Sequence, residues 1–200
     1  SDAEPIAPQD LSLVSPVILT RNEVDVRLRA ARADERAGNY RAALQRLVDI
    51  EATSLDVSLL KARLHARAGE FERSNELLLA IGESSLDAEA SFWLGYGRFN
   101  LQQWQPAVIA LQRAANLNSS DVMNSLYLGL ALQQVGDYRG SIDAFHHVRS
   151  LQPDMPEVAF NTGISWWALG EKQRAYGAFH HFMRITDGQR EAYADQRRRV

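Results

Sequence analysis

Residues 125–153 read SLYLGLALQQVGDYRGSIDAFHHVRSLQP, and this stretch is one copy of a pattern that recurs along the chain. Gly129 in this stretch has counterparts 34 residues away on both sides, at Gly95 and Gly163. Three further columns keep the same step: Ala107, Ser141 and Ala175; Leu111, Phe145 and Phe179; Leu117, Leu151 and Ile185. Four columns at one period predict a repeat protein, in which each unit packs on its neighbours.

Each unit is predicted to consist of two antiparallel helices. The columns of Gly129 and Ser141 hold small residues, which let the two helices approach closely while large side chains fill the space between them. The predicted turns hold glycines that supply the left-handed backbone conformation at a helix end: Gly38, Gly69, Gly136 and Gly170. One pair cannot bury its own apolar face, so the pairs are expected to stack into a superhelix.

Both the spacing and the residues resemble the tetratricopeptide repeat (TPR) family. The quoted stretch carries that family's Leu128-Gly129 pair, its Gly-Asp-Tyr turn at 136–138, the aromatic Phe145 and the closing Pro153. The adjoining units repeat parts of the pattern with Trp93, Leu94, Gly95, Trp104, Gly163, Trp166 and Gly170. The resemblance implies an all-α, right-handed TPR superhelix of about five antiparallel helix pairs plus a C-terminal capping helix.

The chain divides into an arm, five units and the start of a cap. Residues 1–23 hold Pro5, Pro8 and Pro16, and proline restricts its own backbone and that of the preceding residue, so we predict an extended N-terminal arm. The predicted units are 24–54, 55–87, 88–121, 122–155 and 156–189, and residues 190–200 begin the capping helix. The arginines at 197–199 are interpreted as part of the polar, solvated face that a terminal helix needs.

Composition and motifs narrow the classes of function. A net charge of −3 and a pI near 6.0 argue against a general nucleic-acid binder, and no apolar run reaches the length of a membrane span. The sequence has no cysteine, no glycine-rich phosphate loop and no His-Glu-x-x-His motif. We therefore predict a protein that is not an enzyme and uses no cofactor, with a metal- or substrate-handling enzyme as the least favoured alternative.

Two histidine pairs, His146-His147 and His180-His181, are the best metal-ligand candidates. They recur at the same period and are expected at equivalent places on neighbouring second helices. Adjacent residues of a helix point about 100° apart, and no acidic residue or cysteine recurs beside the pairs to complete a ligand shell. Solvated histidines are the favoured interpretation, and metal binding by these pairs stays an open alternative.

The TPR resemblance implies that the first helices line a concave groove, which takes an extended peptide or a helix of a partner protein. Carried onto this chain, the groove-facing places form a basic half and an apolar half. The basic half is Arg32, Arg36, Arg63 and Arg67; the apolar half is Phe92, Trp93, Tyr96, Phe99, Leu126, Tyr127, Leu130, Phe160, Ile164 and Trp167. Large apolar surface beyond the needs of the core is typical of an interaction site.

TPR domains that bind chaperone tails hold a carboxylate with Lys and Asn residues spread over three units. The matching places here are Phe92, Tyr96, Tyr127, Glu157 and Asn161, of which only Asn161 is a suitable polar donor. That carboxylate clamp is therefore not expected in this chain.

A narrower resemblance concerns the setting in which the protein works. The number of units and the proline-containing arm resemble pilotin-like TPR lipoproteins of type IV and Tad pilus assembly, whose partners include the outer-membrane secretin. Because the sequence begins with Ser1 and not with methionine, we interpret it as trimmed or processed, with an export signal or a lipid-bearing cysteine expected upstream of Ser1. This implies a periplasmic, outer-membrane-anchored assembly factor. The alternative is a cytoplasmic chaperone or regulatory scaffold built from TPR units.

Overall fold

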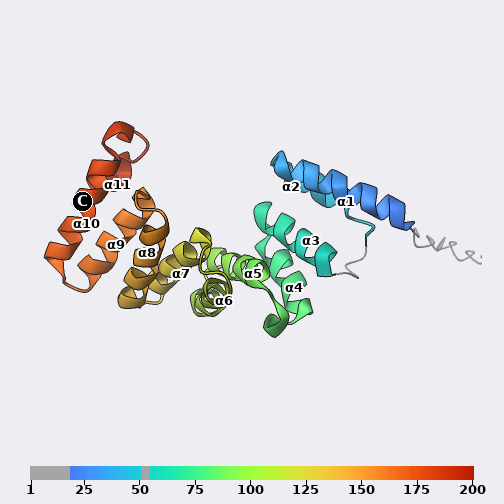
Figure 1. Cartoon of the computed structure of the whole chain (residues 1–200), viewed down its shortest axis with the longest axis horizontal. Helices are drawn as coiled ribbons and strands as arrows, with labels where there is room; N and C mark the ends of the chain where they lie inside the picture. The colour runs from blue at the N-terminus through green and yellow to red at the C-terminus, as the bar shows by residue number, and fades with distance from the viewer. Residues whose placement is uncertain (1–18, 51–54) are drawn as a thin grey trace, which may run out of the picture.

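The computed structural model describes residues 19–50 and 55–200, and in this part of the chain all regular structure is helical. The predicted arm lies outside the described residues up to position 18. Five helix pairs follow one another along an elongated molecule, with α1 at one end and α10 and α11 at the other (Figure 1). Unit one is α1 (Arg21–Arg36) and α2 (Tyr40–Arg46); unit two is α3 (Leu55–Arg67) and α4 (Phe71–Ile81); unit three is α5 (Ala88–Asn100) and α6 (Trp104–Leu117); unit four is α7 (Val122–Gln134) and α8 (Tyr138–Leu151); unit five is α9 (Pro156–Ala168) and α10 (Lys172–Ile185). The predicted all-α TPR superhelix is thus confirmed.

The glycine column marks where the two helices of a unit approach most closely. A Cβ atom on Gly95 would lie 2.5 Å from the Leu111 side chain, and one on Gly129 would lie 2.5 Å from the Phe145 ring. At Gly163 the same atom would lie 2.3 Å from the ring of Phe179. These distances are shorter than carbon atoms tolerate, so the small residues of the sequence pattern are a packing requirement of units three to five.

The turns between the helices of a unit also follow the sequence pattern. Gly38, Gly69, Gly136 and Gly170 all have positive φ, between 78° and 82°, which confirms the predicted left-handed helix ends. In unit three the same place is held by Gln102, with φ of 59°. A side chain in this conformation costs about 1 kcal/mol relative to glycine, so unit three has the strained turn of the series.

The first helix begins three residues earlier than the predicted start of unit one at 24. Thr20 is its N-cap, and the hydroxyl of Thr20 accepts a hydrogen bond from the backbone N–H of Glu23. The Glu23 carboxylate in turn accepts from the backbone N–H of Thr20 at 2.7 Å, which completes a capping box. Residues 21–23 therefore belong to α1 and not to the arm.

The core of the molecule is a series of local clusters. Ala31 and Leu47 of unit one are buried together with Leu64 of unit two, and unit five buries Phe160 with Phe182. The cluster around Leu111 takes side chains from α6, α7 and α8, so it joins two neighbouring units. Each unit therefore depends on the next one for its buried surface, as expected for a superhelix.

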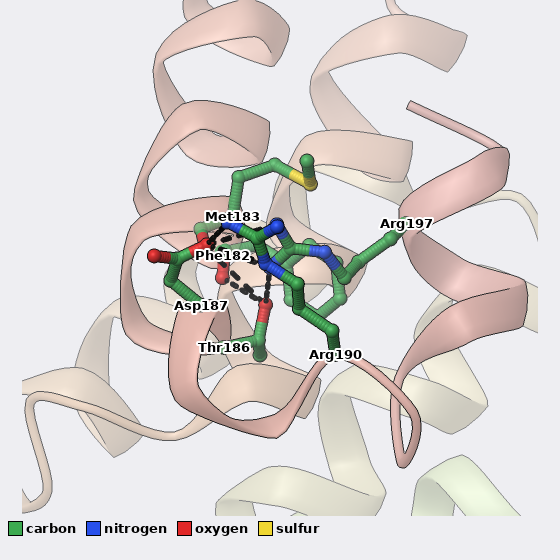
Figure 2. A network of polar contacts seen from close by, with 6 residues as sticks. All are labelled: Phe182, Met183, Thr186, Asp187, Arg190 and Arg197. Atoms are coloured by element: carbon green, nitrogen blue, oxygen red, sulfur yellow. Dashed lines mark hydrogen bonds and ion pairs between the residues drawn. The ribbon is translucent and has the colours of Figure 1, made fainter.

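The chain ends in a short 3₁₀ turn, η2 (Asp187–Gln189), and the short helix α11 (Ala194–Arg198), which packs on unit five. Arg197 donates to the Met183 carbonyl at 2.9 Å and to the Thr186 hydroxyl at 2.8 Å, and Asp187 accepts from both Arg190 and Arg197 (Figure 2). An arginine in this place satisfies free carbonyl groups at the C-terminus of α10. The interpretation of the arginine run as fully solvated is therefore wrong for Arg197, whose side chain is only 14% exposed.

Candidate protein-binding groove

Four aromatic rings from two neighbouring first helices form one cluster. Phe92, Trp93 and Tyr96 lie on α5, and Tyr127 lies on α7. The ring centroids of Tyr96 and Tyr127 are 5.0 Å apart with the planes at 84°, and Phe92 contacts Trp93, Tyr96 and Tyr127 within 5.9 Å. Edge-to-face contacts of this kind fix the rings relative to one another. Each of the four side chains is only partly buried, so the cluster offers ring surface to a ligand.

This cluster lines a groove of about 680 Å³. Its walls come from four units: Tyr40 of unit one, Arg63 and Arg67 of unit two, Ala88, Glu89, Phe92, Trp93, Tyr96 and Asn118 of unit three with its following loop, and Asp121, Met123, Asn124 and Tyr127 of unit four. Met123 is 42% exposed, so a flexible apolar side chain stands at the groove's far rim. This volume is in the range of ligand-binding clefts in proteins.

Arg63 in the groove wall is held by carboxylates of the two adjacent units. Its guanidinium donates to both oxygens of Glu35 on α1, at 2.7 and 2.9 Å, and to Glu89 on α5 at 2.5 Å. Burial alone would lower the pKa of Arg63, but its hydrogen bonds to Glu35 and Glu89, together with the charges of these carboxylates, outweigh burial and raise that pKa. Arg63 therefore links three first helices, and its charge is already compensated within the fold.

Arg67 lies one helical turn further along α3 and has a different environment. Its guanidinium carbon is 5.7 Å from the ring centroid of Tyr40 and 5.5 Å from that of Trp93, so the cation contacts an aromatic ring on each side. Its ion pair, with Glu35, is long at 3.9 Å. The Arg67 side chain is 40% exposed and keeps N–H donors for a ligand in the groove.

Tyr127 brings a partly buried phenol hydroxyl into the aromatic cluster. Burial raises the pKa of Tyr127 above the ordinary value of a phenol, and the nearby hydroxyl of Tyr96 raises it further. The Tyr127 hydroxyl is therefore a neutral hydrogen-bonding group at physiological pH. It adds a polar contact to a surface that is otherwise apolar.

The remaining residues of the predicted groove lie elsewhere. Leu126 and Phe160 are 8% and 7% exposed and belong to the core, and Leu130 packs against the same cluster as Leu126. Phe99 is packed between Trp104 and Tyr127, at 5.2 and 5.8 Å. Arg32 and Arg36 are exposed on α1, outside the residues that line the groove.

A second hollow, of about 250 Å³, lies at the C-terminal end. It is lined by Phe160, Ile164, Trp167, Tyr176, Phe179, Arg199 and Val200. The apolar half predicted from the sequence is thus divided between two separate hollows, one around Tyr96 and one around Trp167. The apolar residues do not form one continuous exposed surface, because the Leu126 and Phe160 side chains are buried in the packing of neighbouring helices.

Sequence reasoning did not find Tyr40, Glu35 and Glu89, although they shape the groove. Tyr40 directly follows the turn at Gly38, where the pattern assigns an aromatic to helix packing. Glu35 and Glu89 are 28 and 26 residues from Arg63, so no local motif connects them. Glu35, Arg63 and Glu89 alternate in charge on α1, α3 and α5, and this alternation appears only when the three units are stacked.

The histidine pairs lie on α8 and α10. His147 Nε2 is 2.7 Å from the Ser119 carbonyl oxygen, and His181 is 3.8 Å from Asp154. Burial lowers the pKa of His146, and the nearby Arg149 lowers it further. In residues 19–50 and 55–200, no group of three or more His, Asp or Glu side chains is arranged to hold a metal ion. No helix in the same part of the chain is long and apolar enough to span a membrane.

Solved structures similar to this chain include forms of a protein named MamA. MamA AMB-1 superimposes with a TM-score of 0.74 and 23% identity, over 84% of this chain and 93% of that chain. MamA MSR-1 has a TM-score of 0.74 and 22% identity, over 83% and 97%. The MamA RS-1 ArsTM double mutant has a TM-score of 0.75 and 17% identity, over 84% and 97%. No protein-family model and no curated protein matches the sequence. At these identities the likeness shows the fold, a TPR-like stack of helix pairs along nearly the whole length of those chains.

Proposed function

We propose that this chain is a protein-binding module whose groove takes an extended or helical segment of a partner protein. The observation that carries the proposal is the aromatic cluster of Phe92, Trp93, Tyr96 and Tyr127, which is rigid, partly exposed and lines a groove built from four units. Aromatic side chains held in place by the fold contribute much binding energy because little ordering remains to be done when a ligand arrives.

The groove's polar groups favour a particular kind of partner segment. An apolar or aromatic side chain of the partner would pack on Tyr96 and Tyr127, and a nearby carboxylate would accept hydrogen bonds from Arg67. Arg63 contributes little to this attraction because Glu35 and Glu89 already compensate its charge. The favoured ligand is therefore an apolar segment with one or two acidic residues, and not a strongly acidic tail.

The experiment is site-specific photocrosslinking in the cells that make the protein. A benzoylphenylalanine in place of Met123 would stand at the rim of the groove, and one in place of Ile109 on α6 gives a control that is also exposed, at 66%. We expect a discrete adduct from position 123 that is absent from position 109. Tyr96→Ala should then weaken binding of the identified partner by about tenfold or more. An adduct from both positions, or a partner indifferent to Tyr96→Ala, would remove the groove as the binding site.

A narrower proposal concerns the cellular setting. The resemblance to pilotin-like TPR lipoproteins supports a periplasmic assembly factor of a pilus or secretion system, with a secretin or pilus-assembly protein as partner and a lipid anchor for membrane attachment. Fractionation of the native protein, with markers for the periplasm and the outer membrane, tests this directly. Recovery with the cytoplasmic marker would favour the alternative, a cytoplasmic chaperone or regulatory scaffold.

A further inference from the structure

The place of Trp167 in unit five is covered in the two preceding units. Gln133 occupies the equivalent place one unit earlier, and Phe99 occupies it two units earlier, at the same step of 34 residues. The Phe99 ring lies 5.8 Å from that of Tyr127 in the next unit. Gln133 donates to the Asn161 carbonyl at 2.7 Å and to the Ser165 hydroxyl at 2.6 Å, also in the next unit. In both cases the first helix of the following unit lies over this place.

In unit five the covering is incomplete. The C-terminal segment packs on both helices of unit five: the Tyr193 ring lies 5.8 Å from that of Phe182 on α10, and the Arg199 guanidinium lies 6.0 Å from the Phe160 ring on α9. Helix α11 (Ala194–Arg198) does not cover the C-terminal end of α9, where Trp167 lies. Trp167 remains 51% exposed and Tyr176 on α10 57% exposed, with their ring centroids 6.1 Å apart.

These two rings line the 250 Å³ hollow, Arg199 also lines it, and Lys172 stands beside the Trp167 ring. The Lys172 ammonium is 6.0 Å from the Trp167 ring, and the Arg199 guanidinium is 6.0 Å from the Phe160 ring. Neither cation forms an ion pair with any residue that the structure describes. By contrast, Arg197 and Arg198 of the same segment are paired with Asp187 and Asp195. The hollow therefore combines exposed aromatic surface with uncompensated positive charge.

We propose that this surface, formed by Trp167, Tyr176, Lys172 and Arg199, docks an acidic amphipathic helix of a partner protein. A helix fits because helices α7 and α9 occupy the equivalent place over units three and four. Its apolar face would pack on Trp167 and Tyr176, and its carboxylates would pair with Lys172 and Arg199. Cation–ring contacts do not prevent this pairing, since an exposed cation can contact a ring and a carboxylate together.

A second copy of the chain is a poorer occupant than an acidic partner. A symmetric contact between two copies would place the same surface on both sides. Lys172 and Arg199 of one copy would then face the same cations of the other, and like charges across an interface are unfavourable. The surface is also separate from the groove around Tyr96, since the residues that line the two hollows do not overlap.

The test uses a fluorescein-labelled synthetic helix of about 16 residues, long enough for roughly four turns. It carries Leu and Phe on one face and Glu elsewhere, and a matched peptide carries Lys in place of every Glu. Fluorescence anisotropy with the whole chain should show binding of the acidic peptide. Trp167→Ala, and separately Lys172→Glu combined with Arg199→Glu, should each weaken that binding by about tenfold. The Lys peptide should bind the wild type more weakly and the charge-reversed variant more tightly.

The matched control is Arg41→Glu combined with Arg139→Glu, two exposed arginines on α2 and α8 that have no ion pair among the described residues. This control and the groove variant Tyr96→Ala should leave binding of the acidic peptide unchanged. Equal binding of the two peptides, insensitivity to Trp167→Ala and the charge reversal, or loss of binding in Tyr96→Ala would each overturn the proposal. So would a concentration-dependent dimer in sedimentation that disappears with Trp167→Ala, because the second copy would then be the occupant.

Discussion

In units one and two the first helices are joined by charged side chains, whereas in units three to five the helices of each pair meet around glycine. Arg63 on α3 links Glu35 on α1 to Glu89 on α5, and within unit one Arg46 on α2 pairs with Asp34 on α1 at 2.5 Å. In the later units Gly95, Gly129 and Gly163 receive Leu111, Phe145 and Phe179 at distances that leave no room for a Cβ atom. The small-residue column of the first two units holds Ala31 and Ala62, which are fully buried with their Cβ atoms accommodated.

The difference shows that one repeat pattern can be stabilised in two ways. Close packing around glycine needs a large partner side chain and tolerates no added volume. A charged link tolerates looser packing but needs each partner to be present, because a carboxylate left alone in a partly buried place loses its compensation. The boundary between the two regions also holds unsatisfied groups: Ser74 Oγ, Asn75 Oδ1 and Ser91 Oγ, on α4 and α5, are buried without a hydrogen-bond partner among the described residues.

The largest effect is expected from Gly129→Leu in the tightly packed region. The new side chain would overlap the Phe145 ring, which is fully buried and cannot move aside, so unfolding free energy should fall by about 3 kcal/mol. Thermal melts followed by circular dichroism measure this. The matched control is Gly177→Ala on α10, where an added Cβ has open space and better helix propensity should stabilise slightly. A Gly129→Leu variant as stable as wild type would refute the packing account of units three to five.

The second effect tests the charged region. Arg63→Met removes the partner of Glu35, whose side chain is only 10% exposed, and should cost about 1–2 kcal/mol of unfolding free energy. Arg67, 3.9 Å from the same carboxylate, would compensate part of the loss. Chemical denaturation measures the change, and Arg41→Met is the control, because Arg41 is exposed without an ion pair among the described residues. If the unfolding free energy of Arg63→Met and Arg41→Met falls by the same small amount, the ion pairs of Arg63 do not stabilise the first units.

The two regions also differ in how far the sequence predicts them. In units three to five the 34-residue period identifies the helix pairs, the glycine contacts and the turns at Gly136 and Gly170, because these depend on residues at fixed separations within one unit. The ion pairs of Arg63 join residues 28 and 26 positions apart, across units of unequal length, so no period reveals them. The early start of α1 could have been found, since Thr20 and Glu23 form the Thr-x-x-Glu signature of a capping box.

The candidate groove was predictable in its residue types and less so in its extent. The excess of aromatic residues on α5 indicates a surface beyond the needs of the core, and Phe92, Trp93, Tyr96 and Tyr127 do line the groove. The neighbouring helices determine whether a residue on the inner face stays exposed, and they bury Leu126 and Phe160. The inward position of Arg197 also depends on a neighbouring helix. Its carbonyl acceptor, Met183, lies at the end of α10, and the sequence of α11 alone does not reveal that contact.

A third, smaller effect concerns the turn of unit three. Gln102→Gly should raise the unfolding free energy by up to about 1 kcal/mol, because glycine adopts positive φ without the steric cost that Gln102 bears. The reciprocal variant Gly136→Ala, in the next unit, should lose a similar amount, since Gly136 has φ of 82°. Denaturant titration of both variants under the same conditions gives the comparison. Destabilisation by Gln102→Gly would mean that the Gln102 side chain contributes more than its backbone strain costs.

The smallest effect concerns an ion pair at the boundary of the two regions and depends on pH. Arg98 on α5 donates to both carboxylate oxygens of Glu83, at 2.6 and 3.3 Å. This hydrogen bonding lowers the pKa of Glu83. Burial opposes the lowering, and the charge of Arg98 reinforces it. A carboxyl whose folded pKa lies below its unfolded value of 4.5 stabilises the fold above that value, and the contribution disappears as the pH falls through the folded pKa. Glu83 is about half exposed, so solvent screening limits the contribution to below about 1 kcal/mol.

Glu83→Gln should therefore be less stable than the wild type at neutral pH, and the two proteins should approach equal stability on acidification below 4.5. Denaturation midpoints measured at several pH values test this, with Glu72→Gln as the control, since Glu72 is exposed without an ion pair among the described residues. The Glu83→Gln deficit, measured relative to Glu72→Gln, should therefore shrink on acidification. A Glu83→Gln deficit that persists in acid would mean that shape and hydrogen bonding, and not charge, connect η1 (Glu83–Ser85) to α5. The contact between Glu83 and Arg98 would then stabilise the fold as the close packing of units three to five does, and not as the ion pairs of units one and two do.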